Sequence, residues 1–182
     1  MRHVVGICGE ARSGKDTIAD YLSNEYGFRK IAFADRLKQL LNNLFFLTHS
    51  QLYDGERKEE VDLQWGKSPR VLMQEVGDKM REVHPDIWVK HVINHVDAIS
   101  DADFVISDVR YRSEFDAIKA LGGEVWSVRR PDGPKIKTKD HISETELQTI
   151  PDDFFDNIIV NKTISEALKE VDYAMKALRL KK

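Results

Sequence analysis

Residues Gly9–Thr17, with the sequence GEARSGKDT, lie between a short apolar segment that ends at Cys8 and a segment with helical spacing, 17–25. Glycines near both ends of this stretch let successive backbone N–H groups turn inward around a polyphosphate, and the N-terminus of the following helix adds its dipole. Lys15 is placed where its ammonium group would reach the β- and γ-phosphates. The order of strand, glycine-rich loop and helix therefore predicts a phosphate-binding loop rather than a chance glycine turn.

The position after the lysine departs from the usual pattern. A Ser or Thr whose hydroxyl binds Mg²⁺ ordinarily follows this lysine, whereas the chain has Asp16. A carboxylate coordinates Mg²⁺ directly or through water, although here its charge would lie close to the phosphates. We therefore keep Asp16 as a candidate metal ligand, and we expect the hydroxyl of Thr17 near the α-phosphate.

Composition narrows the class of protein. The chain has 182 residues, which fits one compact domain, and its 41% of hydrophobic residues is enough to fill a core. Its 28 Lys and Arg against 31 Asp and Glu give a net charge of -3, which argues against a protein that coats nucleic acid or an anionic membrane. A single cysteine, Cys8, cannot form an intramolecular disulfide, and the apolar run after Met1 is too short for a signal peptide or a membrane span. We expect a cytoplasmic protein.

Five short apolar segments predict strands that alternate with helices. Most of them are apolar on both faces, which is typical of a parallel sheet covered by helices. The expected fold class is α/β, with three αβα layers around a parallel sheet of about five strands. The predicted strands are 3–8, 29–33, 104–107, 125–128 and 157–160.

Capping residues mark several helices. Ser68 followed by proline suits an N-cap and first turn, while Thr163 with Glu166 and Ser143 with Glu146 match capping boxes. The segment between the second and third strands has about 70 residues, much more than a simple crossover needs. We expect a single domain, 1–182, with a helical insertion at about 35–99 that caps the sheet and a lid at about 130–142. The predicted helices are 17–25, 35–47, 69–83, 87–99 and one that follows Thr163.

Polar positions outside the loop separate the classes of phosphate-loop protein. A GTPase would place a glycine three residues after the aspartate that follows the third strand, but Tyr111 occupies that position after Asp108. The pair Asn161-Lys162 also lacks the second aspartate, because residue 164 is isoleucine. A motor would need a larger oligomeric apparatus. The length, the insertion and the arginines favour a small-molecule kinase.

Several stretches of the chain resemble the sequence motifs of a known protein family. They are GKDT at 14–17, FADRLK at 33–38, the segment 70–88 with Gln74, Gly77 and Arg81, DVR at 108–110 followed by Glu114, and HISE at 141–144. Together they resemble the deoxynucleoside monophosphate kinases of tailed bacteriophages, over nearly the whole chain. The Lys-Asp-Thr form of the loop and the Asp-Val-Arg with its downstream Glu are the more specific parts. The resemblance implies a nucleoside monophosphate kinase-like fold, ATP as donor, Mg²⁺ as metal and a deoxynucleoside 5′-monophosphate as acceptor.

Asp108 and Arg110 follow the third predicted strand, at the sheet edge where open α/β proteins bind ligands. Phosphoryl transfer requires the protein to hold donor and acceptor in line and to neutralise the charge on the transferring group. The fork of Arg110 can bind two phosphate oxygens, and Asp108 could hold a Mg²⁺-bound water or orient the acceptor phosphate. The alternative is a local ion pair that closes a βα turn.

The insertion carries the candidate residues for the acceptor. Arg70, Gln74 and Arg81 have the spacing of one polar stripe on a helix, which could bind phosphate and base or could simply be a solvated face. Trp88 could stack on the base or belong to the core of its helix. Asp35 either contacts the acceptor sugar or caps the helix that follows it.

The segment after the fourth strand, Arg129–Lys139, is rich in turn formers and cations. Such a segment could close over ATP and exclude water, or it could be a solvated loop. Arg130 is the candidate catalytic cation in it, and Asn161 lies in the region where related kinases hold adenine. His91 and His95 have helical spacing, but no third ligand accompanies them, so we do not favour a metal site there.

The expected site can be stated in full. The catalytic candidates are Lys15, Asp108, Arg110 and Arg130, and the metal candidates are Asp16 and Asp108. The cofactor-binding candidates are Gly9, Ala11, Arg12, Ser13, Gly14, Lys15, Asp16, Thr17 and Asn161. The substrate-binding candidates are Asp35, Lys38, Arg70, Gln74, Arg81, Trp88, Asp108, Arg110 and Glu114.

We therefore expect ATP-dependent phosphorylation of deoxynucleoside 5′-monophosphates to diphosphates. The expected partners are small-molecule nucleotides, without nucleic acid or membrane, and a homodimer is left open. One alternative is another small-molecule kinase that resembles phosphomevalonate kinase, which has a similar Gly-Lys-Asp loop. The other is a nucleotide-binding regulatory module that does not hydrolyse nucleotide quickly.

Overall fold

The computed structural model describes residues 2–133 and 146–180. It divides into two compact units, of which one comprises Met1–Ala32 and Val92–Lys182 and the other Phe33–His91. We call them the sheet unit and the helical unit. The helical unit ends at His91, whereas the sequence analysis places the end of the insertion at about residue 99, so the last residues of that segment belong to the sheet unit.

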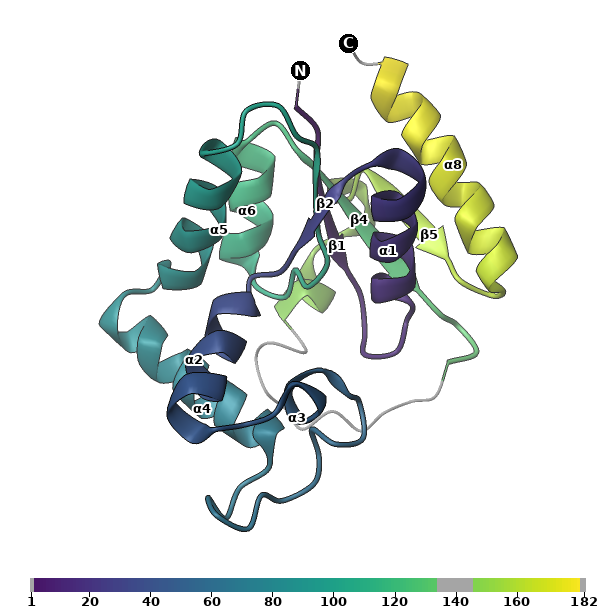
Figure 1. Ribbon diagram of the computed structural model, residues 1–182. Coiled ribbons are helices and arrows are strands. Elements are labelled where there is room, and N and C mark those ends of the chain that lie inside the picture. The colour runs from purple at the N-terminus through teal and green to yellow at the C-terminus, as the bar shows by residue number, and fades with distance from the viewer. Residues whose placement is uncertain (1, 134–145, 181–182) are drawn as a thin grey trace. The chain divides into compact units, whose positions relative to one another are not determined.

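The sheet unit contains a five-stranded sheet in which every described pair of neighbours is parallel (Figure 1). The strand order is β2-β3-β1-β4-β5. β1 lies at the centre, where Gly6 pairs with Ile106 on one side and with Val125 on the other. The predicted fold class is confirmed, and each predicted strand segment overlaps one observed strand, of which β4 is one residue longer at each end than predicted. The strands are β1 (Val4–Cys8), β2 (Arg29–Ile31), β3 (Phe104–Ile106), β4 (Glu124–Arg129) and β5 (Asn157–Val160).

Helices cover both faces of this sheet. α1 (Lys15–Tyr26) and α8 (Ile164–Leu180) pack on one face, over a core that includes Val5, Val105 and Trp126. α6 (Arg112–Ala120) packs on the opposite face, where Ile118 lies so close to Gly6 that a Cβ atom there would be 2.5 Å from its Cδ1. The three layers follow from the strands being apolar on both sides.

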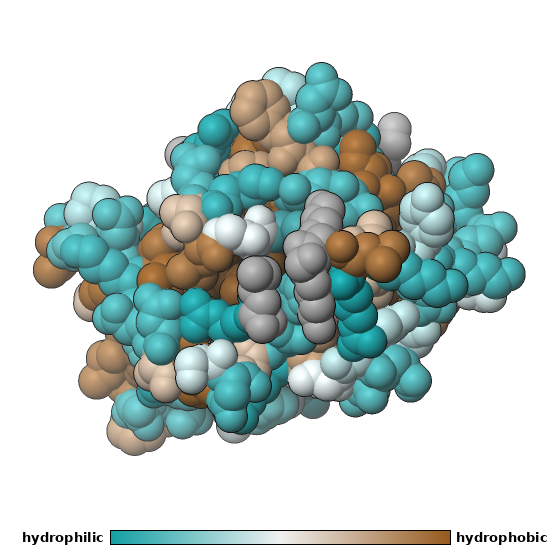
Figure 2. All heavy atoms as spheres, turned by 90° about the horizontal axis from the view of Figure 1, so that it is seen from above, coloured by the Kyte–Doolittle hydropathy of each residue, from teal (hydrophilic) through white to brown (hydrophobic). Residues whose placement is uncertain are grey.

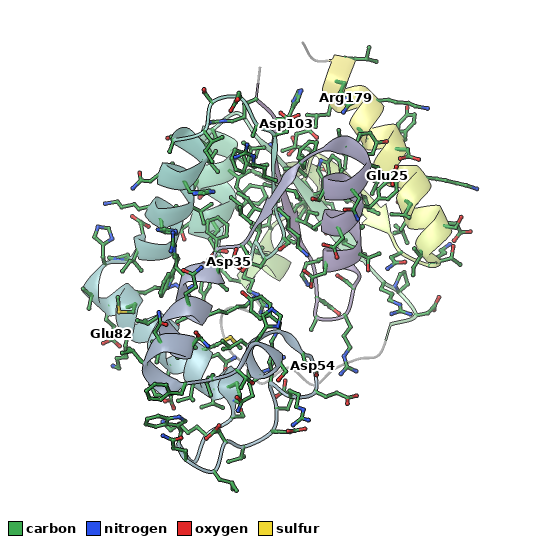
Figure 3. The ribbon with its side chains drawn as sticks, viewed as in Figure 1. Glu25, Asp35, Asp54, Glu82, Asp103 and Arg179 are labelled. Atoms are coloured by element: carbon green, nitrogen blue, oxygen red, sulfur yellow. The ribbon has the colours of Figure 1, made fainter. Side chains whose placement is uncertain are left out.

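α1 and α8 are joined by a polar link between two tyrosines of α1 and an aspartate in the middle of α8. The hydroxyls of Tyr21 and Tyr26 both donate to Asp172 Oδ1, at 2.8 and 2.7 Å. These two hydrogen bonds hold the pKa of Asp172 below its usual value of 3.8. Arg179, labelled in Figure 3, lies over the ring of Tyr26, 5.1 Å from its centroid. The helix that follows the phosphate loop is thus tied to the C-terminal helix.

The helical unit has its own core. Its helices are α2 (Asp35–Phe45), α3 (His49–Tyr53), α4 (Pro69–Val83) and the first residues of α5 (Ile87–Asp97). Ser68 caps α4 as predicted, because its hydroxyl accepts a hydrogen bond from Val71 N. The core of the unit is formed by Leu37, Leu41, Leu47, Leu52, Leu72 and Trp88.

Two short 3₁₀ helices, η1 (Glu146–Thr149) and η2 (Asp152–Phe154), precede β5. Most of the predicted lid, together with the HISE motif at 141–144 and the Ser143 cap, lies outside the described residues. The face seen in Figure 2 is mostly hydrophilic, with small hydrophobic areas between. Within the described residues, no helix is both long and apolar enough to cross a membrane.

Candidate active site

Within the Gly9–Thr17 stretch, Lys15–Thr17 already belong to α1, and Gly9–Gly14 form the loop between β1 and α1. Three of its residues have positive φ: Gly9 at 143°, Arg12 at 62° and Gly14 at 104°. A Cβ atom at Gly9 would lie 2.3 Å from the carbonyl oxygen of Val128, so only glycine fits there. α1 begins without a side-chain cap on its first N–H groups. A loop that ends on an uncapped helix N-terminus is suited to anions.

Lys15 lies over this loop. Its Nζ donates to the carbonyl oxygens of Gly9 and Glu10, at 2.8 and 2.7 Å. The ammonium group is therefore held across the mouth of the loop by backbone atoms. A phosphate bound in the loop would lie within reach of this cation.

A cavity of about 450 Å³ adjoins the loop. It is lined by residues that follow β1, β3 and β4 and by residues of the η1–η2 region. The cations among them are Arg12, Arg110, Arg129 and Arg130, and apolar side chains such as Leu147, Ile150 and Phe155 form another part of the wall. A cavity of this size, lined by both arginine and apolar side chains, is suited to binding a small phosphorylated ligand. The sequence analysis did not single out the apolar residues, although their spacing fits a short helix.

Asp16 is exposed, and its Oδ1 lies 3.1 Å from Nζ of Lys30. Lys30 also binds Asp20, one helical turn further along α1, at 2.8 Å. The two carboxylates raise the pKa of Lys30, although burial acts in the opposite direction. Lys30 thus offsets the extra negative charge that Asp16 brings to the loop, and the sequence analysis missed it.

The oxygen donors near the loop fit a magnesium ion. Asp16 and Thr17 lie in the first turn of α1, which β1 reaches through the loop, and Asp108 lies in the turn after β3, the parallel neighbour of β1, so all three come after the carboxyl ends of adjacent strands. Mg²⁺ prefers such hard oxygen ligands and usually retains several waters beside one or two carboxylates and the phosphates. Among residues 2–133 and 146–180, no three His, Cys, Asp or Glu side chains form a preassembled metal site.

Arg110 lines the cavity from the turn between β3 and α6. The turn is organised by Glu114, whose side chain is buried and accepts hydrogen bonds from the backbone N–H groups of Arg110 and Tyr111, at 2.7 and 3.1 Å. Glu114, predicted to bind substrate, is thus placed beneath the backbone of this turn. Glu114 thereby fixes the backbone position that carries the Arg110 side chain.

Arg129, the last residue of β4, and Arg130, which follows it, differ in their surroundings. Arg129 forms a two-point ion pair with Asp152 of η2, in which Nη1 lies 2.9 Å from Oδ2. This contact lowers the pKa of the Asp152 carboxyl. Arg130 lies next to it on the cavity wall. Because Arg129 is engaged by a carboxylate, Arg130 is the better candidate for contact with a ligand.

Asn161 follows β5 and is buried. Its Nδ2 donates to the carbonyl oxygen of Ser13, at 2.8 Å, so the side chain contacts the phosphate loop itself. Cys8, at the end of β1, also lines the cavity. Burial raises the pKa of its thiol to about 11, which keeps it protonated near neutral pH.

The helical unit contains the remaining predicted substrate residues. Asp35 is the first residue of α2, as Figure 3 shows. Lys38 Nζ lies 4.0 Å above the ring of Tyr53. Trp88 is in the core, where its indole N–H donates to the carbonyl of Gly77 at 3.3 Å, so the structure favours the core role for this ring.

The predicted polar stripe lies on one continuous helix, α4. Arg70, Gln74 and Arg81 are all half-buried there. Arg70 pairs with Glu59, and Arg81 Nη1 lies 3.2 Å from Asp78 Oδ1. His91, the other residue considered on this unit, accepts a hydrogen bond from Arg36 Nε at 2.6 Å.

A parallel sheet with a glycine-rich loop after its central strand and helices on both faces is the architecture of the P-loop proteins, a class that includes kinases. Solved structures agree. A sugar kinase from Janibacter sp. HTCC2649 is 16% identical, with a TM-score of 0.55 over 98% of this chain and 95% of that one. A dephospho-CoA kinase from Campylobacter jejuni is 18% identical, with a TM-score of 0.50 over 98% of this chain and 96% of that one.

Sequence comparison gives the family. The profile of the deoxynucleotide monophosphate kinase family matches residues 57–171. A protein of Acanthamoeba polyphaga mimivirus, provisionally named a deoxynucleotide monophosphate kinase, is 37% identical over 92% of this chain and 93% of its own length. The chain therefore belongs to the deoxynucleotide monophosphate kinase family and is a kinase, which confirms the resemblance. An uncharacterised protein of Ictalurid herpesvirus 1 is 27% identical over 71% of this chain and 49% of its own length.

Proposed function

We propose that this kinase transfers the γ-phosphoryl group of ATP to a deoxynucleoside 5′-monophosphate and releases ADP and the deoxynucleoside diphosphate. The observation that carries the proposal is the phosphate loop with Lys15 across its mouth, beside a cavity lined by Arg110 and Arg130. Family membership supports nucleotides as substrates.

The donor is assigned to the loop. Backbone N–H groups of the loop and of the start of α1 bind the phosphates of ATP, and Lys15 neutralises the charge that develops between the β- and γ-phosphates. Mg²⁺, held by Asp16 and Asp108 with the phosphates, supplies charge neutralisation and orientation when it is bound. Thr17, the next residue of α1, is assigned to the α-phosphate through its hydroxyl.

The acceptor phosphate is assigned to Arg110. Its guanidinium departs from a turn that Glu114 fixes, and its planar fork can bind two phosphate oxygens at once. Arg130 provides a second cation on the cavity wall. Fixed cations of this kind lower the cost of bringing two anionic nucleotides together.

For the rest of the acceptor we retain Asp35, Lys38, Arg70, Gln74 and Arg81 of the helical unit. Three of them are half-buried on one face of α4, which suits contact with a phosphate or a base. Trp88 supports this unit from its core.

The deciding experiment is an acceptor panel with the purified protein, ATP and Mg²⁺, read for ADP and diphosphate product. We expect one or more deoxynucleoside monophosphates to be phosphorylated, and we expect Lys15→Ala to keep its fold and to form product at least about a hundredfold more slowly. Turnover only with phosphomevalonate would establish a different kinase. If no acceptor raised ATP turnover, the protein would be a nucleotide-binding module and the proposal would be wrong.

A further inference from the structure

We propose that Asn161 is a positioning residue that sets the orientation of the phosphate loop, and that it acts through the Ser13 carbonyl rather than by contact with the adenine. The inference rests on the proposed use of ATP as donor. The sequence analysis placed Asn161 near adenine from its position after the last strand. The contacts of its side chain point to a different role.

The first observation is a buried hydrogen bond across the sheet edge. Asn161 Nδ2 donates to the Ser13 carbonyl oxygen at 2.8 Å, and the Asn161 side chain is buried. Asn161 is itself anchored, because its backbone N–H donates to the Arg129 carbonyl at 2.7 Å. The amide therefore presents a fixed donor to the loop.

The second observation is close packing against Gly14. A Cβ atom at Gly14 would lie 2.4 Å from Asn161 Nδ2, so the amide fills the space that a side chain would take. Gly14 has a φ of 104° and is the N-cap residue of α1. The same amide thus contacts both residues of the Ser13-Gly14 peptide.

These contacts determine the direction in which the backbone N–H group of Gly14 points. In a trans peptide the C=O and N–H groups point in opposite directions. When the Ser13 carbonyl is directed at Asn161, the Gly14 N–H is directed away from it, to the other side of the loop. Without Asn161 this peptide could rotate and direct its carbonyl toward the phosphates, where an acceptor repels an anion.

The test compares Asn161→Ala with a matched control, Asn157→Ala. Asn157 begins β5, and its amide donates to Glu124 Oε2 at 3.2 Å, so the control removes a similar hydrogen bond from the same strand without touching the loop. Calorimetry without acceptor gives the ATP affinity, and thermal unfolding gives the stability of each variant. We expect Asn161→Ala to bind ATP about tenfold or more weakly, and Asn157→Ala to bind it as the wild type does.

A base-free ligand separates the loop from the adenine. Inorganic tripolyphosphate competes with ATP through phosphates alone, so its inhibition constant should rise in Asn161→Ala by the same factor as the ATP dissociation constant. If tripolyphosphate inhibited wild type and variant equally while ATP bound more weakly, Asn161 would contact the base and the inference would be overturned. Equal ATP affinity of wild type and Asn161→Ala would also overturn it.

Should Asn161→Ala not fold, Asn161→Ser replaces it, because a serine hydroxyl keeps a polar group at the end of β5 but is too short to reach the Ser13 carbonyl. The same loss of ATP and tripolyphosphate affinity is expected. ATP binding does not require transfer, so the two proposals fail separately. Absence of diphosphate product in the wild type would reject the proposed function, whereas unchanged affinities in the variant would reject the role of Asn161.

Discussion

At the scale of single residues, Lys15 is half-buried at the start of α1, and its Nζ donates to the backbone carbonyls of Gly9 and Glu10 rather than packing in the core. We expect Lys15→Ala to keep its fold and to lower the transfer rate by at least about a hundredfold, because a cation aimed at developing charge is lost. Circular dichroism and product formation are measured on the same sample. A folded variant with near-normal turnover would contradict the assignment of the phosphate loop.

Arg110 is predicted to act on the acceptor. Arg110→Lys keeps the charge but loses the planar two-point contact, so the acceptor KM should rise about tenfold or more and turnover should fall. The affinity for ATP, measured directly, should stay the same. Weaker ATP binding with an unchanged dependence on the deoxynucleoside monophosphate would show that Arg110 belongs to the donor.

Asp16 and Asp20 offer a matched pair, since both bind Lys30 but only Asp16 adjoins the loop lysine. If Asp16 helps to hold Mg²⁺, Asp16→Ala should raise the Mg²⁺ concentration that gives half-maximal rate, and Asp20→Ala should not. The measurement is a magnesium titration of the rate, with ATP affinity in the absence of metal as a reference. If Asp16→Ala and Asp20→Ala required the same Mg²⁺ concentration, Asp16 would not bind the metal and would serve only to order the loop.

At the scale of elements, the link between α1 and α8 gives a pH-dependent prediction. The folded-state pKa of Asp172 lies below 3.8, so its contribution to stability is present above that pH and is lost as the pH falls through the folded-state value. Asp172→Ala should cost about 1 kcal/mol near neutral pH, which corresponds to a Tm lower by about 2–4 °C. Melting curves of wild type and variant should converge in acid. A Tm difference that did not change with pH would show that the Asp172 charge contributes nothing.

The strands and most of the long helices could be predicted from the sequence, since apolar runs and caps such as Ser68 are local signals. α6 was not identified, because its N-cap residue is Tyr111 and the carboxylate of Glu114 supplies the capping contact from within the helix. The signal in the sequence that could have indicated the start of α6 was Glu114, three residues after the N-cap residue Tyr111. α3, with only five residues, is too short for periodicity to reveal.

At the scale of the molecule, the charge distribution predicts a salt effect. The net charge is -3, yet Arg110 and Arg130 line the cavity that we assign to anionic nucleotides. If these local cations dominate, kcat/KM should fall when the ionic strength rises from about 0.01 M to about 0.15 M, over which the Debye length shrinks from about 30 Å to about 8 Å. A rate that increased with salt would show that the overall negative charge dominates instead.

Contacts between distant parts of the chain explain what the sequence analysis of the site could not supply. Motif spacing identified the loop, but Asn161 and Ser13 are 148 residues apart, and no local pattern relates them. The same holds for Arg129 and Asp152, whose pairing distinguishes two adjacent arginines that look equivalent in the sequence. For Trp88 the two roles were equally compatible with helical spacing, and only packing favours the core.

The connection between β2 and β3 has a further consequence. These strands are neighbours, and the residues of the helical unit, Phe33–His91, are inserted into the crossover that joins them. Because the entropy lost on closing a loop grows only with the logarithm of its length, such an insertion can lengthen, shorten or be exchanged at little cost to the pairing of the strands. If the helical unit binds the acceptor, as we propose, substrate preference can diversify by replacing this one continuous segment of the gene, while the phosphate loop is inherited unchanged.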